Sequence, residues 1–281
     1  MKNPFVLRTA ALTAALIAGL LSGCGGDTPE SLIASGKEFL AKKDSKAAVI
    51  QFKNALQQNP NSGEARFFLG KALLEEGDAR GAEVQLRKAY DLKHAPDLTA
   101  PLLVKAMLAT GQTKKVVEEF SNLELSGEAA ANLKTSLSLA YRAIGNKEAA
   151  EVALAAALNA KPDYAPARLA EARTKFTQED IRGAIAIIDD VLSKTPDDAD
   201  ALLLKGSMLA VKGDQASAVV LYRKAVQSKP DHLAAHAAIF SALMQNGALD
   251  DAAKQLDEMK KVAPKNLQTL YLETQLAYQQ K

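Results

Sequence analysis

The chain has few of the residues and motifs that enzymes use for catalysis. Its 281 residues include one cysteine, three histidines and no tryptophan. No GxSxG turn, Walker-type glycine loop, HExxH motif or cysteine–histidine pairing occurs in it. The sequence therefore predicts no catalytic residues, no metal site and no cofactor, and we expect a protein that is not an enzyme.

The histidines and paired carboxylates have simpler explanations. His232 and His236 lie four residues apart at the start of a predicted helix, but no cysteine, Glu or third His completes a metal site around them. We predict solvated or turn-packing histidines there. The carboxylate pairs Asp197-Asp198 and Asp250-Asp251 stand at helix starts, where capping and the helix dipole favour acidic residues.

The overall charge gives no argument for nucleic acid as a partner. The chain has 35 Lys and Arg residues and 33 Asp and Glu residues. Lys2 and Arg8 belong to a segment that we expect to be removed, and without them the two counts are equal. A nucleic-acid-binding protein would need a basic face.

A period of 34 residues dominates the sequence. Prolines recur at positions 162, 196, 230 and 264, and turn glycines lie on the same grid, with Glu179 in place of one glycine. In the stretch Ala199–Pro230, apolar residues at helical spacing form two amphipathic helices that are interrupted by Gly213-Asp214. Such a hairpin has an apolar face without a partner of its own, so it must stack on copies of itself.

The packing positions identify the kind of repeat. They alternate small and large residues, as in Gly36, Phe39, Ala48, Phe52, Ala55 and Pro60, and again in Gly206, Leu209, Ala218, Tyr222, Ala225 and Pro230. An all-helical 34-residue period with these positions resembles the tetratricopeptide repeat. The resemblance implies an all-α, right-handed solenoid of stacked helix-turn-helix repeats over residues 29–281, with about seven repeats and the first helix of an eighth.

Several irregularities interrupt the array. We expect a longer turn near His94-Ala95-Pro96, and a degenerate third repeat, Asp97–Ser126, that lacks its terminal proline. In the seventh repeat Phe240 occupies a position usually given to glycine or alanine, and we expect neighbouring alanines to make room for it. Tyr271, Leu276 and Tyr278 are too apolar for a capping face, so we expect further repeats beyond residue 281.

The N-terminus resembles a bacterial lipoprotein signal. The apolar run Ala10–Leu21 is too short to span a bilayer, and it ends in Leu21-Ser22-Gly23-Cys24, which is similar to the lipobox. We expect residues 1–23 to be a signal peptide and residues 24–28 to be an acylated (palmitate-bearing) Cys24 with a short linker. Gly25 after the cysteine suggests the outer membrane, facing the periplasm. The alternative is an ordinary signal peptide with an incidental cysteine.

The resemblance to tetratricopeptide repeats also implies where partners bind. In that family the first helix of each repeat lines a concave groove, and on this basis the groove residues are Lys37, Phe67, Phe68, Lys71, Lys105, Arg142, Arg173 and Phe176. Lys37, Lys71 and Lys105 recur at the repeat spacing and should form a ladder. Cations alternating with apolar groups suit an extended peptide or an acidic polymer. The alternative is that these positions are simply solvated.

Two segments, Ala48–Pro60 and Glu64–Leu74, together with the lipobox, resemble the tetratricopeptide lipoprotein of the PEP-CTERM/exosortase sorting system. This resemblance implies a lipid-anchored scaffold that binds envelope proteins or a polymer, in surface-protein sorting or exopolysaccharide export. Two alternatives stay open. One is an assembly lipoprotein of another envelope machine, such as a pilus secretin or an outer-membrane barrel. The other is a substrate-recruiting array whose enzyme domain lies beyond residue 281.

Overall fold

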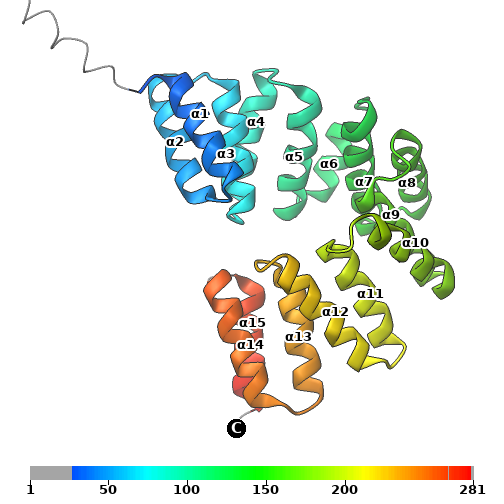
Figure 1. The fold of residues 1–281 in the computed structure, drawn as a ribbon. Coiled ribbons are helices and arrows are strands. Elements are labelled where there is room, and N and C mark those ends of the chain that lie inside the picture. Colours follow the sequence, from blue (N-terminus) through cyan, green and yellow to red (C-terminus); the bar gives the residue numbers. More distant parts are fainter. Residues whose placement is uncertain (1–26, 265, 280–281) are drawn as a thin grey trace, which may run out of the picture. The chain divides into compact units, whose positions relative to one another are not determined.

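The computed structural model describes residues 27–264 and 266–279, so Cys24 and the predicted signal peptide lie outside the described residues. All regular structure within the described ranges is α-helical (Figure 1). The prediction of an all-α array of helical hairpins is confirmed. The helices are α1 (Pro29–Ala41), α2 (Ser45–Gln58), α3 (Gly63–Glu75), α4 (Ala79–Asp91), α5 (Pro96–Ala109), α6 (Thr113–Phe120), α7 (Gly127–Ala143), α8 (Lys147–Ala160), α9 (Ala165–Thr177), α10 (Ile181–Lys194), α11 (Ala199–Val211), α12 (Gln215–Ser228), α13 (Leu233–Gln245), α14 (Leu249–Val262) and α15 (Leu267–Gln279).

The helices fall into two compact units, which we describe separately. The N-terminal unit contains α1–α6 and ends at Phe120, and the C-terminal unit contains α7–α15. Within each unit, the first helix of a hairpin approaches the first helix of the next to within 8 Å at the Cα atoms, as α1 does with α3 and α9 with α11. Among the described residues, consecutive second helices such as α2 and α4 do not approach so closely. The first helices therefore line the inner face of each unit, and the second helices form its outer face.

Each hairpin turn contains one residue in the left-handed conformation. Positive φ angles recur at the same position of successive repeats, at five glycines and at two residues that carry side chains, Lys43 (φ 60°) and Glu179 (φ 65°). The amides of the left-handed residue and of the next residue close the preceding helix. In the sixth repeat, the Gly213 N–H donates to the Ala210 carbonyl oxygen, and the Asp214 N–H donates to the Leu209 carbonyl oxygen. The Asp214 carboxylate then accepts a hydrogen bond from the Ser217 N–H and caps the next helix. This turn reverses the chain in a few residues and sets the geometry of every repeat.

Replacing Glu179 with glycine is expected to stabilise the α9–α10 hairpin by about 1 kcal/mol, because the left-handed conformation strains a residue with a Cβ and not a glycine. The Glu179 side chain is exposed, so its loss removes no packing. Hydrogen exchange of the α9 and α10 amides measures the change. The matched control, Gly213→Glu, should destabilise α11 and α12 by a similar amount. A Glu179→Gly protein no more stable than the parent would contradict this reading.

Inside several hairpins, a glycine on the first helix faces a large residue on the second. A Cβ atom on Gly36 would lie 2.5 Å from Cε1 of Phe52, and one on Gly206 would lie 2.6 Å from Cε1 of Tyr222. These distances are too short for any side chain, so glycine permits the close approach of the helices. The seventh repeat reverses the sizes: Phe240 on α13 is fully buried, and it packs in one cluster with Ala237 and with Leu256 of α14.

The third repeat is irregular, as predicted, but the longer turn predicted before it is not found. The turn that precedes this repeat, residues 92–95, has four residues, as does the equivalent turn at residues 59–62, so the prediction of a longer turn is wrong. It differs in backbone conformation instead, because Lys93 and Ala95 have positive φ angles. The second helix of this repeat, α6, has eight residues, whereas the other second helices have 13 or 14. At the last helix, Leu276 is buried and contributes to packing, while Tyr271 and Tyr278 are exposed.

Candidate functional site

The inner face of the N-terminal unit carries the predicted lysine ladder. Lys37, Lys71 and Lys105 occupy equivalent positions on α1, α3 and α5, and all three are exposed. Lys37 forms an ion pair with Glu64 of α3. Its Nζ also lies 4.6 Å from the centroid of the Phe68 ring, which is a cation–π contact. The first lysine of the ladder is thus already paired.

Within the described ranges, the other two lysines have no such partner. Glu64 reaches Lys37 from the repeat that follows it, and the residue equivalent to Glu64 in the third repeat is Leu98, which is exposed. Among the described residues, Lys71 and Lys105 form no ion pair. Sequence reasoning did not identify Glu64 as a partner, although an acidic residue in the first turn of the next inner helix could have indicated the pair.

The two phenylalanines predicted for this face have different roles. Phe68 is half-buried and stacks on Phe52, with ring centroids 5.7 Å apart. Phe67 is only 6% exposed, and its ring packs against those of Phe68 and His94 at centroid distances of 5.0 and 5.6 Å. Phe67 therefore belongs to the packing between helices and offers little surface to a partner. Phe68 contacts the Lys37 ammonium group through the face of its ring.

The remaining predicted groove residues belong to the C-terminal unit. Arg142 of α7 donates a hydrogen bond to Oγ1 of Thr174 at 2.8 Å, Arg173 is exposed, and Phe176 packs partly buried at the edge of the α9–α11 core. Arg173 and Asp200 have the same separation in the sequence as Lys37 and Glu64. A hydrogen bond from His232 lowers the pKa of Asp200, and the charges of Lys229 and Arg173 lower it further.

The buried histidines His232 and His236 stabilise the turn before α13 through hydrogen bonds, in agreement with the prediction of turn-packing histidines. His232 precedes α13, and its Nδ1 accepts a hydrogen bond from the Ala235 N–H, so its Nε2 carries the proton that is donated to Asp200 Oδ1 at 3.1 Å. His236 is 4% exposed and is bonded through its two ring nitrogens to the Pro230 carbonyl oxygen and to Gln255. In the described part of the chain, no three His, Cys, Asp or Glu side chains come close enough to hold a metal ion.

Aspartate capping is also confirmed. Oδ1 of Asp198 accepts a hydrogen bond from the Ala201 N–H at 2.8 Å at the start of α11. Asp250 and Asp251 lie in the first turn of α14, where the helix dipole stabilises negative charge. These carboxylates therefore serve the fold, as the sequence predicted.

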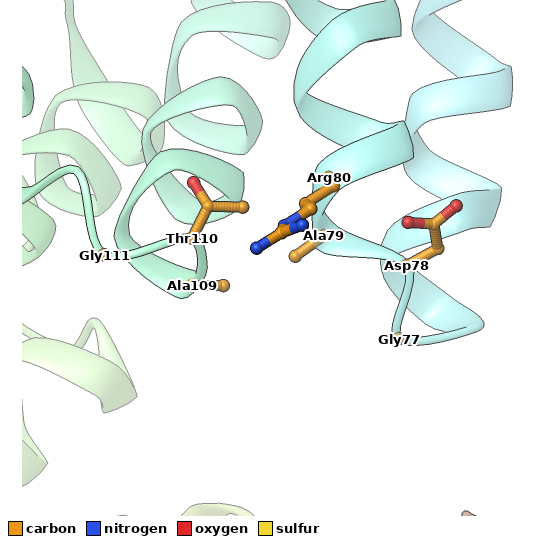
Figure 2. Close-up of a pocket in the computed structure, with 7 residues that line it drawn as sticks. All are labelled: Gly77, Asp78, Ala79, Arg80, Ala109, Thr110 and Gly111. Carbon is orange, nitrogen blue, oxygen red and sulfur yellow. The ribbon is translucent and has the colours of Figure 1, made fainter. Parts of the chain in front are cut away.

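A shallow pocket of about 530 Å³ lies between two hairpin turns of the N-terminal unit, and Figure 2 shows Arg80 extending across it towards Thr110. The pocket is lined by Gly77, Asp78, Ala79, Arg80, Ala109, Thr110 and Gly111. The Asp78 carboxylate is engaged in capping α4 through the Gly81 N–H. Arg80 is the one basic residue in the lining, and it forms no ion pair with the described residues. No nucleophilic side chain lies beside a base in this lining, so the pocket does not have the arrangement that catalysis needs. Within the described ranges, no helix is both long and apolar enough to cross a bilayer.

Helical hairpins recur at a constant sequence spacing, and in several of them a glycine faces a large residue. Such hairpins define an all-α repeat solenoid, which offers extended surfaces to partners. Sequence patterns of the tetratricopeptide repeat match residues 39–91, 131–164, 169–232 and 212–276, which together are more than half of the chain. The chain belongs to the tetratricopeptide repeat family.

Several known proteins are similar to this chain in sequence or in fold. An uncharacterized protein of Sinorhizobium fredii, y4yS, is 31% identical over 120 residues, and the match covers 43% of this chain and 65% of that protein. A tetratricopeptide repeat protein from Parabacteroides merdae superposes with a TM-score of 0.61 at 15% identity, covering 91% of this chain and 100% of that one. The pilF structure from Pseudomonas aeruginosa gives 0.51 at 15% identity, covering 74% and 94%. At these identities the two structures show the fold alone.

Proposed function

We propose that this protein is a non-enzymatic scaffold, anchored to the outer membrane through acylated Cys24 and facing the periplasm. In this proposal it binds envelope proteins or an acidic polymer on its inner face, in surface-protein sorting or exopolysaccharide export. Tetratricopeptide repeat arrays suit protein–protein interaction, and the chain belongs to that family. The similarity of two sequence segments and of the lipobox to the PEP-CTERM-associated lipoprotein supports the specific role.

The observation that carries the binding role is the unequal pairing of the ladder lysines. Glu64 neutralises Lys37, whereas Lys71 and Lys105 form no ion pair in the described ranges. Two exposed cations one repeat apart, on adjacent helices of an inner face, match an extended ligand with negative groups at intervals. Leu98 and the half-buried Phe68 give the same face apolar contacts.

The ladder can be tested in cells that express the full chain. Lys71→Glu/Lys105→Glu should lower the recovery of crosslinked partners from intact envelopes at least about tenfold, because two attractive charges become repulsive ones. Lys37→Glu should have a smaller effect, because Glu64 already neutralises Lys37 in the parent. Fractionation before crosslinking should find the protein in the outer membrane.

The matched control is Lys147→Glu/Lys224→Glu, which reverses two exposed lysines on the outer helices of the C-terminal unit. It should leave partner recovery unchanged. Equal recovery with the ladder variant and the parent would exclude the inner-face lysines from binding. Recovery of the protein from the soluble fraction would instead argue against the lipid anchor and leave the ladder untouched.

A further inference from the structure

Among the helices of the N-terminal unit, the outer ones carry most of the positive charge. The inner helices α1, α3 and α5 contain four basic and five acidic residues, whereas the outer helices α2, α4 and α6 contain seven basic and four acidic ones. The seven basic residues are Lys46, Lys53, Arg80, Arg87, Lys88, Lys114 and Lys115. Helix α2 contains no acidic residue at all. The outer face of this unit is therefore basic, although the chain as a whole is nearly neutral.

Three of these cations form a second ladder. Lys46, Arg80 and Lys114 occupy equivalent positions in successive repeats, each is the second residue of its outer helix, and each is exposed. None of them forms an ion pair with the described residues. Figure 2 shows the Arg80 side chain extended into the space between two hairpin turns.

The position of this ladder is unfavourable for the helices themselves. A cation in the first turn of a helix opposes the helix dipole, which favours acidic residues there. The inner helices α1, α3 and α5 follow that preference with Glu30, Glu64 and Asp97, and the outer helices α2, α4 and α6 have no acidic residue in the first turn. Helix stability therefore does not explain why cations occupy these three positions. Binding of an external partner with negative charge explains them better.

Two of the four acidic residues on these outer helices are already engaged. Glu83 accepts hydrogen bonds from Thr110 and Gln112, and Glu119 forms an ion pair with Arg87 at 2.7 Å. These contacts tie the second repeat to the third. The exposed ladder cations thus keep their charge available to a ligand.

Exposed apolar side chains lie between the cations of the outer helices. Ile50 and Val84 are 57% and 51% exposed, and each follows a ladder cation by four residues, so it lies on the same helix face. Lys53 follows Ile50 by three residues, and Lys88 follows Val84 by four. The result is a face on which isolated apolar groups are surrounded by positive charge.

The chain enters the array beside this face. Nε2 of Gln58, the last residue of α2, donates a hydrogen bond to the carbonyl oxygen of Asp27 at 2.9 Å. Asp27, two residues before α1, therefore lies next to the C-terminal end of an outer helix. Cys24 lies three residues before Asp27.

We propose that this outer face of the N-terminal unit, formed by α2, α4 and the start of α6, lies on an anionic lipid surface. Each Lys or Arg near such a surface is attracted to the lipid phosphates, and the isolated apolar side chains reach the headgroup layer. An acidic protein would need similar charges, but the place where the chain enters the array favours the bilayer. The inner face of this unit is then turned away from the membrane, and its ladder is open to partners.

The test uses the mature chain from residue 24 with Cys24→Ser, so that neither the signal peptide nor an acyl chain contributes and the result does not depend on the proposed anchor. We expect it to sediment with vesicles of one part phosphatidylglycerol to two parts phosphatidylcholine, and to bind less as salt is added. The triple variant Lys46→Gln/Arg80→Gln/Lys114→Gln should lower the partition coefficient on the order of a hundredfold, and Ile50→Thr/Val84→Thr should lower it several-fold.

The matched control removes the same charge from the inner face. Lys37→Gln/Lys71→Gln/Lys105→Gln should keep vesicle binding within about threefold of the parent. The proposal is overturned if the outer-face triple binds like the parent, if both triples lose binding equally, or if the parent binds pure phosphatidylcholine as well. Binding of the outer face to polyglutamate without binding to vesicles would identify an acidic protein site instead. Circular dichroism confirms that each variant stays helical, and the crosslinking test of the inner face is independent of all these outcomes.

Discussion

Replacing Phe240 with alanine is expected to lower the free energy of unfolding of the α13–α14 hairpin by about 3–5 kcal/mol. Phe240 is fully buried and packs with Ala237, Ala252 and Leu256. The substitution would bring this position closer to the repeat pattern, which has Gly206 at the equivalent place. By pattern alone it should be neutral or stabilising. The structure predicts the opposite, because Leu256 is too small to fill the space that Phe240 occupies.

Hydrogen exchange of the α13 and α14 amides is the suitable measurement, because repeat arrays open locally and a single midpoint averages their repeats. Val220→Ala on the outer face of α12 is the control. Val220 is 54% exposed, so its truncation should change local stability by less than about 0.5 kcal/mol. An equal effect of both substitutions would show that Phe240 does not fill the core of its hairpin.

The regular period of the sequence predicted the architecture because each repeat buries the same positions. The close approach of Gly36 to Phe52 and of Gly206 to Tyr222 follows from residue size alone, and the structure confirms it. The turn glycines were also visible in the sequence. Lys43 has the same left-handed conformation as those glycines, but its residue type gives no signal of it. There the geometry of the stack determines the turn, and the local sequence does not.

The candidate site was less predictable than the fold. Repeat spacing identified Lys37, Lys71 and Lys105 as equivalent, but their charge environment depends on the residue that the next repeat supplies. That residue is Glu64 in one case and Leu98 in another. Phe67 was predicted to be a groove residue, yet it is buried and packs against His94. Repeat equivalence therefore predicts where a side chain stands, while its partners come from the interface between unlike repeats.

Replacing Gly206 with phenylalanine, the residue found at the equivalent position 240, is expected to destabilise the α11–α12 hairpin by about 3 kcal/mol or more. The new Cβ would meet Cε1 of Tyr222 at 2.6 Å and the Ala218 carbonyl oxygen at 3.1 Å. The same side chain that fills the core of the seventh repeat is thus too large for the sixth. Local hydrogen exchange of α11 and α12 measures the loss.

A double-mutant cycle with Tyr222→Leu distinguishes a local size conflict from a general intolerance of α11 to large residues. Gly206→Phe/Tyr222→Leu recreates the pair Phe240 and Leu256, so it should be more stable than the sum of the two single changes by at least about 1 kcal/mol. The close approach to the Ala218 carbonyl oxygen remains in the double variant, so recovery should be incomplete. Additive effects would mean that the backbone spacing of each hairpin is fixed by its neighbours in the stack. A favourable coupling would mean that the small–large pair sets the spacing within the hairpin itself.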